Sequence, residues 1–184
     1  FGFNAGSALA ADGLAAHAFM TSAIASASAM LIWMLIDYLK SKKTTLVGAS
    51  TGLVVGLVAI TPGAGFVPIW SSFLIGALVS PICYFDDALD AFGCHGIGGI
   101  WGGIATGLFG KTSVNSVARW NGLVFGDFHL FTAQLISILV TIAVAVCGTL
   151  ICIGIVRIFT PLRVDVSAEI SGLDFSQHGE NAYP

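Results

Sequence analysis

This chain of 184 residues is 56% hydrophobic and 9% charged, with a mean hydropathy of +0.92 and a formal net charge of −3. Soluble domains carry about 25% charged residues, so the composition excludes a soluble globule and predicts a membrane protein. The small acidic net charge also argues against a nucleic-acid partner. The four cysteines lie in apolar stretches without metal-ligand spacing, so neither a metal site nor a cofactor is expected.

Six apolar stretches predict an all-α fold, a polytopic transmembrane helical bundle, over residues 1–158. We expect spans near residues 1–11, 14–36, 46–60, 66–85, 87–110 and 131–158. The first stretch resembles the end of a spanning helix, and no initiating Met precedes Phe1. We therefore interpret the chain as the C-terminal part of a longer protein. Residues 159–184 are polar and are expected to form a cytoplasmic tail.

Polar and aromatic residues share one face of the first stretch. Asn4 and Ser7 are three residues apart on one side of a helix, and Phe3 lies next to them. An aromatic ring and a hydroxyl at a membrane mouth suit a small cation, and ordinary interfacial packing is the alternative. Thr61 begins a Pro- and Gly-rich stop at residues 61–65, and it is a candidate to line a water-filled mouth.

His95 stands in the middle of the stretch Ala91–Gly110, which has no charged residue. In a helix that starts at Asp87, it would lie about 12 Å from the start, near the centre of a hydrocarbon core about 30 Å thick. An ionisable residue at this depth is a functional candidate, and a histidine that only packs is the alternative. Small residues recur every four positions around His95 and form one stripe on the helix: Ala91, His95, Gly99, Gly103 and Gly107. Because small residues allow another helix to approach closely, this stripe predicts that His95 faces into the protein.

Charged residues at the ends of the stretches predict the orientation in the membrane. Asp87 and Asp90 suit the N-terminus of the His95 helix, where carboxylates cap free amides and complement the helix dipole. Lys and Arg concentrate in cytoplasmic loops. If residues 40–43 are cytoplasmic, five basic residues lie inside and two outside, and the tail is also inside.

Four segments, in order along nearly the whole chain, resemble the ammonium transporter (Amt/Rh) family, Amt branch. They are FGFNAGSA (1–8), ITPGAGF (60–66), DDALDAFGCHGIGGIWGG (86–103) and LRV…GLD…HGENAY (162–183). The resemblance implies the C-terminal half of an eleven-helix inverted-repeat transporter, from the end of helix six to helix eleven and the tail. It further implies a homotrimer in the plasma membrane that carries ammonium or ammonia for nitrogen metabolism. The family's N-terminal half would supply the first pore histidine, the other gate phenylalanine and an external tryptophan.

The resemblance also implies roles for single residues. His95 matches the second of two paired pore histidines, Phe3 a ring of the phenylalanine gate, Ser7 the hydroxyl of the external ammonium site, and Thr61 a motif near the pore. Structural positions near the pore are Asn4, Asp90, Gly99 and Gly103. A regulatory tail, whose implied partner is a PII-type nitrogen-signalling protein, is marked by Gly172, Asp174, His178 and Glu180. Phe85 runs directly into Asp86, where family members usually carry a longer loop, so the resemblance does not extend to the local helix ends or to a contact with that partner there.

Two other functions fit the same residues. An ammonium sensor on this scaffold would normally carry an additional effector domain, and residues 159–184 supply none, which favours transport. A non-conducting fragment that needs the N-terminal half is the other alternative. An enzyme is not expected, because the sequence shows no nucleophile–base pair, nucleotide-binding loop or metal cluster.

Overall fold

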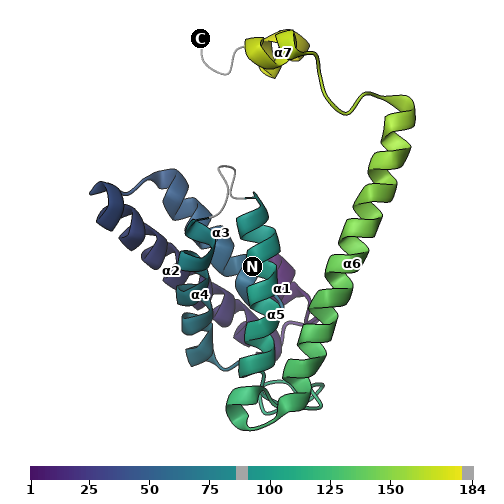
Figure 1. Ribbon diagram of the computed structural model, residues 1–184. Helices are drawn as coiled ribbons and strands as arrows, with labels where there is room; N and C mark the ends of the chain where they lie inside the picture. Colours follow the sequence, from purple (N-terminus) through teal and green to yellow (C-terminus); the bar gives the residue numbers. More distant parts are fainter. Residues whose placement is uncertain (86–90, 180–184) are drawn as a thin grey trace. The chain divides into compact units, whose positions relative to one another are not determined.

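The computed structural model describes residues 1–85 and 91–179, which form helices and turns and contain no strand (Figure 1). This agrees with the expected all-α fold. The helices are α1 Gly2–Gly6, α2 Gly13–Ser41, α3 Leu46–Ile60, α4 Ile69–Tyr84, α5 Gly98–Phe109, α6 Phe128–Phe159 and α7 Val166–Ser171. Two π-helical turns, Gly93–Ile97 and Asp174–His178, and a 3₁₀ turn, Leu123–Phe125, complete the described elements. The chain divides into two compact units, Phe1–Leu139 and Val140–Pro184.

Two of the described helices are long and apolar enough to cross a membrane, namely Gly13–Ser41 with 29 residues and Phe128–Phe159 with 32 residues. The apolar helices Leu46–Ile60 and Ile69–Tyr84 are shorter. At 15 and 16 residues they are about 23 Å long, less than a hydrocarbon core of about 30 Å. Helices therefore occur in these expected stretches, and their role as complete spans stays a prediction.

Local side-chain chemistry explains where the helices of the first unit begin. The Asp12 carboxylate accepts a hydrogen bond from the Ala15 N–H at 3.0 Å and caps α2. Thr45 Oγ1 caps α3 in the same way by accepting from the Gly48 N–H at 2.9 Å. Pro68 precedes α4, a position where its missing N–H costs nothing. Between α3 and α4, the stop predicted at residues 61–65 is a series of turns.

Helix α2 packs against α1, α3 and α4 within the first unit (Figure 1). Small residues allow the close approach, since Cβ atoms added to Gly56 of α3 and Gly76 of α4 would both meet the carbonyl oxygen of Ala25. Serine hydroxyls add hydrogen bonds between helices. Ser28 Oγ donates to Phe73 O at 3.1 Å, and Ser80 Oγ donates to Ala29 O at 2.6 Å.

The structure corrects three details of the expected helices. The helix in the first stretch ends at Gly6 instead of residue 11, and the chain then turns through Leu9 with a φ of 57°. The second helix extends to Ser41, where the left-handed Lys42 ends it. The helix of His95 is not uniformly α-helical, because a π turn covers Gly93–Ile97. The predicted capping residues of that helix, Asp87 and Asp90, lie outside the described residues.

In the second unit, the described part of the tail contains α7 and the π turn Asp174–His178. Arg163 forms a bidentate ion pair with Glu169, with Nε 2.9 Å from Oε1 and Nη2 2.8 Å from Oε2. The carboxylate of Glu169 raises the pKa of Arg163 above its usual range. Gly172 ends α7 with a φ of 85°, a conformation that side chains other than glycine rarely adopt. The tail is therefore locally folded before it reaches any partner.

Candidate functional site

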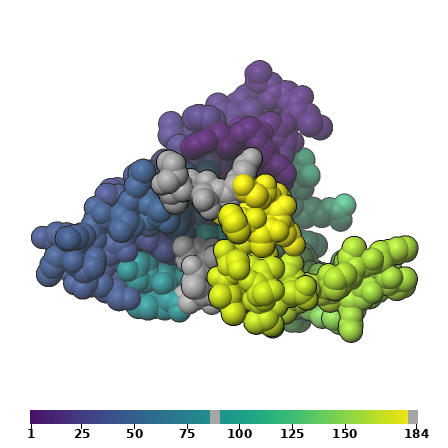
Figure 2. Space-filling model, turned by 90° about the horizontal axis from the view of Figure 1, so that it is seen from above, coloured from purple at the N-terminus to yellow at the C-terminus, as the bar shows by residue number. Residues whose placement is uncertain are grey.

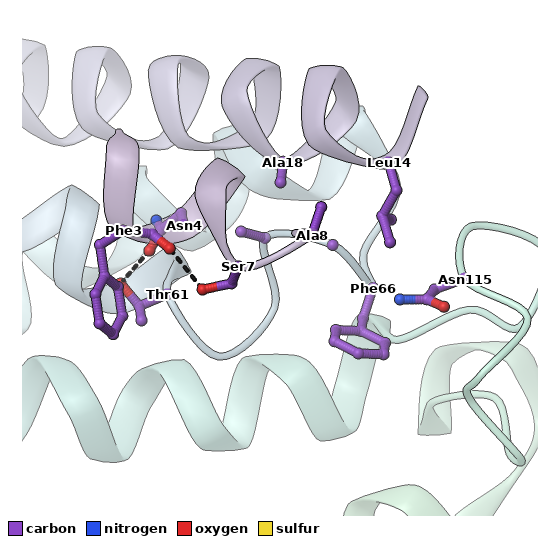
Figure 3. A pocket seen from close by; sticks show the side chains of 11 residues that line it. Phe3, Asn4, Ser7, Ala8, Leu14, Ala18, Thr61, Phe66 and Asn115 are labelled. Carbon is purple, nitrogen blue, oxygen red and sulfur yellow. Dashed lines mark hydrogen bonds between the residues drawn. The ribbon is translucent and has the colours of Figure 1, made fainter. Parts of the chain in front are cut away.

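Residues from distant parts of the first unit enclose a pocket of about 170 Å³ (Figure 3). Four of the sequence-predicted site residues line it together: Phe3, Asn4, Ser7 and Thr61. The other lining residues are Ala8, Leu14, Ala18, Ala64, Gly65, Phe66 and Asn115. The surface of the pocket is mainly apolar, with a few polar atoms from hydroxyl and amide groups.

Asn4 connects the three segments that build this pocket. Its Nδ2 donates a hydrogen bond to Ser22 Oγ of α2 at 2.9 Å, and its Oδ1 lies 3.2 Å from Thr61 Oγ1. The hydroxyl of Ser22 in turn donates to Ala18 O at 2.7 Å. Through these bonds Asn4 holds α1 against α2 and the end of α3, which places Phe3 and Ser7 at the pocket.

The hydroxyl groups of the pocket have already used their hydrogens within the protein. Ser7 Oγ donates to Phe3 O at 2.6 Å, as Figure 3 shows. The single hydrogen of Thr61 is directed to Leu57 O at 2.7 Å or to Asn4 Oδ1. Because a hydroxyl has one hydrogen and two lone pairs, both oxygens offer only acceptor capacity to a bound molecule. The pocket therefore suits a ligand that donates hydrogen bonds.

Phe66 and Asn115 belong to the pocket and were not among the predicted site residues. Phe66 directly follows the Pro- and Gly-rich stop that Thr61 begins, so its closeness to that residue in the sequence was a usable signal. Asn115 comes from the connection after α5, and no sequence pattern marked it. The backbone bond from Lys111 N to Phe66 O, 2.8 Å long, brings this connection to the pocket.

His95 lies outside this pocket, within the π turn Gly93–Ile97. Its side chain is exposed on the described chain. Gly98 packs beside Val58, and Gly102 packs against Ala59 and Pro62, which places the helix of His95 along α3. Because Thr61 follows at the end of α3, the pocket lies toward the C-terminal end of the same helix pair.

The predicted glycine stripe divides among different neighbours in the structure. A Cβ on Gly103 would meet Ile138 of α6 at 2.9 Å, and a Cβ on Gly107 would meet Phe131 at 3.0 Å. A Cβ on Gly99 would meet nothing within 4 Å. Gly103 thus serves close packing against α6, as small residues do between membrane helices, whereas Gly99 faces open space.

The remaining predicted site residues are on the tail or outside the described chain. Gly172 ends α7, and Asp174 and His178 begin and end the following π turn, all three exposed. Asp90 and Glu180 lie outside the described residues.

The family model described as Ammonium Transporter Family matches residues 1–183. This chain belongs to the ammonium transporter family. The ammonium transporter of Bacillus subtilis is 46% identical over 194 residues, which cover 100% of this chain and 48% of that protein. Ammonium transporter Amt1 of Archaeoglobus fulgidus is 42% identical and is covered to the same extent, 100% and 48%. These relatives are named as transporters, in agreement with a transport protein and not an enzyme.

Solved structures of family members share the fold. Mep2 of Saccharomyces cerevisiae aligns with a TM-score of 0.71 and 36% identity over 78% of this chain and 38% of that chain. Mep2 of Candida albicans aligns with a TM-score of 0.80 and 30% identity over 90% and 40%. A sensor Amt protein, at 23% identity and a TM-score of 0.78, is similar in fold alone. The chain spans about half the length of the curated relatives it matches, 48% for two of them.

Proposed function

We propose that this ammonium transporter family chain supplies one half of a pore that takes ammonium at the pocket and passes ammonia along the face of His95. The observation that carries the proposal is the meeting of Phe3, Ser7 and Thr61 around one cavity, with both hydroxyl hydrogens already used. The names of the relatives support the substrate class.

Ammonium matches the chemistry of this pocket. It is a cation with N–H donors and no acceptor, so the free lone pairs of Ser7 and Thr61 suit it. The ring of Phe3, which is 77% exposed, offers its negative face, and such a contact contributes about 0.5–2 kcal/mol. Sodium and potassium also bind to oxygen lone pairs, but they have no proton to lose, so only ammonium can continue as a neutral molecule.

Beyond the pocket, an uncharged species passes an apolar channel more easily than an ion. Moving a bare cation into a medium of low polarity costs many kcal/mol, whereas neutral ammonia has no charge to desolvate. A neutral imidazole has one N–H and one lone pair, so His95 is able both to accept from and to donate to a passing molecule. The proton left at the mouth would then return or cross separately.

The face that carries His95 needs a covering segment. His95 and Phe3 are exposed on the described chain, and a Cβ on Gly99 would meet open space. A histidine on a lipid-facing surface would be costly, so we infer that another polypeptide segment closes the pore over this face. This chain covers 48% of the Bacillus subtilis transporter, so about half of such a protein remains to supply the covering segment.

The assembly and its location follow from the same proposal. The pore would lie in the plasma membrane, within the homotrimer that the family resemblance implies, with Lys40, Lys42 and Lys43 on the cytoplasmic side. The tail would then be cytoplasmic. Its polar composition, with exposed helices α7 and Asp174–His178, suits a regulatory partner, which by resemblance is a PII-type protein.

Uptake of methylammonium by vesicles that contain the native polypeptide tests the pore. Ser7→Ala removes one acceptor, and we expect an apparent KM about two- to tenfold higher, the range for one hydrogen bond. Ser113→Ala, at an exposed serine in the connection after α5, is the matched control and should change nothing. His95→Ala should lower uptake or admit potassium. Unchanged uptake and unchanged potassium exclusion in His95→Ala would contradict the proposal.

Removal of residues 165–184 tests the tail. We expect a changed uptake rate, or a lost response to the nitrogen status of the cell, with an unchanged thermal midpoint of the membrane part. If the truncated protein takes up methylammonium and responds to nitrogen as the intact protein does, the regulatory role is wrong.

A further inference from the structure

The carbonyl of Gly93 receives two hydrogen bonds at the turn that carries His95. The Gly98 N–H donates to Gly93 O, five residues back, which is the bond that defines a π turn. The Cys83 thiol of α4 also donates to Gly93 O, with Sγ 3.1 Å from the oxygen. Both Cys83 and Gly93 are buried, and the side chain of Cys83 is 2% exposed.

The π turn changes the direction of His95 relative to the rest of its helix. A π turn holds one more residue than an α turn, so residues before and after it no longer share the regular spacing of four. After the turn, Gly99 faces open space and Gly103 packs on Ile138, and before them His95 is exposed. The sequence GCHGI has two glycines and a low helix propensity, so it does not favour either turn strongly by itself.

Contacts on the C-terminal side hold the helix in place around this turn. Trp101 Nε1 donates to Ile75 O of α4 at 3.0 Å, and Gly98 packs beside Val58 of α3. On the N-terminal side of the turn, the hydrogen bond from Cys83 to Gly93 O holds the helix against α4 in the same way. With both ends held, the hydrogen-bond pattern of the turn decides where the imidazole points.

We propose that Cys83 is a positioning residue for His95: its thiol stabilises the π turn by bonding to Gly93 O and thereby sets the direction of the imidazole. The inference rests on the proposed role of His95 in the pore. Cys83 acts through the backbone and touches no substrate. Its hydrogen-bond donor, and not only its volume, is what the role requires.

Two substitutions separate the donor from the volume. In vesicles with the native polypeptide, Cys83→Ala should lower methylammonium uptake about two- to tenfold, the range for one net hydrogen bond. Cys83→Ser keeps a donor and should restore most of the uptake. Cys147→Ala, at an exposed position of α6, is the matched control and should change nothing. Equal losses in the Ala and Ser variants would overturn the proposal.

A double substitution tests whether Cys83 acts through His95. If it does, Cys83→Ala together with His95→Ala should give the uptake of His95→Ala alone. An additional loss of the size seen for Cys83→Ala alone would overturn the proposal. So would full uptake in Cys83→Ala when His95→Ala is inactive.

Amide hydrogen exchange distinguishes this inference from the proposed function. The Gly98 N–H should exchange faster in Cys83→Ala than in the native protein and return to the native rate in Cys83→Ser. If His95→Ala transports normally, the proposed function fails, and the exchange rate at Gly98 still shows whether Cys83 holds the turn. Unchanged exchange in Cys83→Ala would overturn the positioning role.

Discussion

Tyr84 donates a hydrogen bond to Asp37, with the phenol oxygen 2.8 Å from Oδ1 of the carboxylate. This contact joins the end of α4 to the end of α2, next to the start of α3, and Figure 2 shows these blue and teal ends side by side. The ring of Trp33 packs on Tyr84 with 5.0 Å between centroids. The other carboxylate oxygen, Oδ2, is buried and has no hydrogen-bond partner among the described residues.

Tyr84→Phe should therefore destabilise the protein. The substitution would remove the donor to Oδ1 of a half-buried carboxylate, and a hydrogen bond to a charged group contributes about 1.5–3 kcal/mol. We expect a lower midpoint of thermal unfolding in detergent, measured by loss of the native elution peak after heating. Tyr38→Phe, at an exposed tyrosine of α2, is the matched control. Equal midpoints for the two variants would contradict the prediction.

Gly56→Ala should disturb the packing of α3 on α2. The added Cβ would lie 2.5 Å from Ala25 O and 2.7 Å from Ser26 Cα, and backbone atoms cannot move away as a side chain could. Such overpacking costs about 1–3 kcal/mol. Gly148→Ala is the control, because a Cβ there meets nothing within 4 Å and alanine favours a helix. The same thermal assay should show a loss for Gly56→Ala alone.

Asn4→Leu should weaken substrate binding without removing any residue that contacts the substrate in our proposal. The change keeps the branched shape and the number of side-chain heavy atoms but loses the bonds to Ser22 and Thr61 that place Phe3 and Ser7. We expect an apparent KM for methylammonium uptake that is about two- to tenfold higher. Ser22→Ala removes one of the two bonds and should give a smaller increase. A larger effect in Ser22→Ala than in Asn4→Leu would contradict this reading.

Asp127 should titrate at unusually low pH. The backbone N–H of His129 donates to Asp127 Oδ1 at 3.0 Å, and the ring nitrogen Nδ1 of His129 lies 2.8 Å from the same oxygen. These contacts favour the charged carboxylate and lower the pKa of Asp127 below 3.8. Because the folded pKa lies below the unfolded one, the contact stabilises the fold fully above pH 3.8 and is lost as the pH falls through the lowered pKa.

A substitution at His129 separates the contribution of its ring to that pKa shift from the contribution of the backbone. His129→Ala keeps the backbone donor and loses the ring, so the pKa of Asp127 should rise only part of the way toward 3.8. Solid-state NMR of protein with ¹³C-labelled aspartate carboxyls measures the titration, and Asp127→Asn identifies the resonance. A complete return to 3.8 in His129→Ala would show that the backbone bond contributes nothing.

Composition and short motifs in the sequence predicted the helices and the family, and local side-chain chemistry favours two of the helix starts. Long apolar stretches with few charges are enough to predict helices, because a backbone in lipid must satisfy its own hydrogen bonds. Thr45 and Pro68 stand at the helix starts that their side chains favour, and the family was recognisable from short motifs such as FGFNAGSA.

Only the tertiary structure decided which distant residues meet and in which direction they point. Phe3 and Thr61 are 58 positions apart in the chain, and no periodicity could place both at one pocket with Asn115. Periodicity also assumed a uniform α-helix at His95, whereas the structure has a π turn there, and Gly93 O of that turn accepts a hydrogen bond from Cys83 of another helix. Hydropathy and spacing are local properties of the sequence, but the hydrogen bonds that build this site join segments whose contact arises only in the packed bundle.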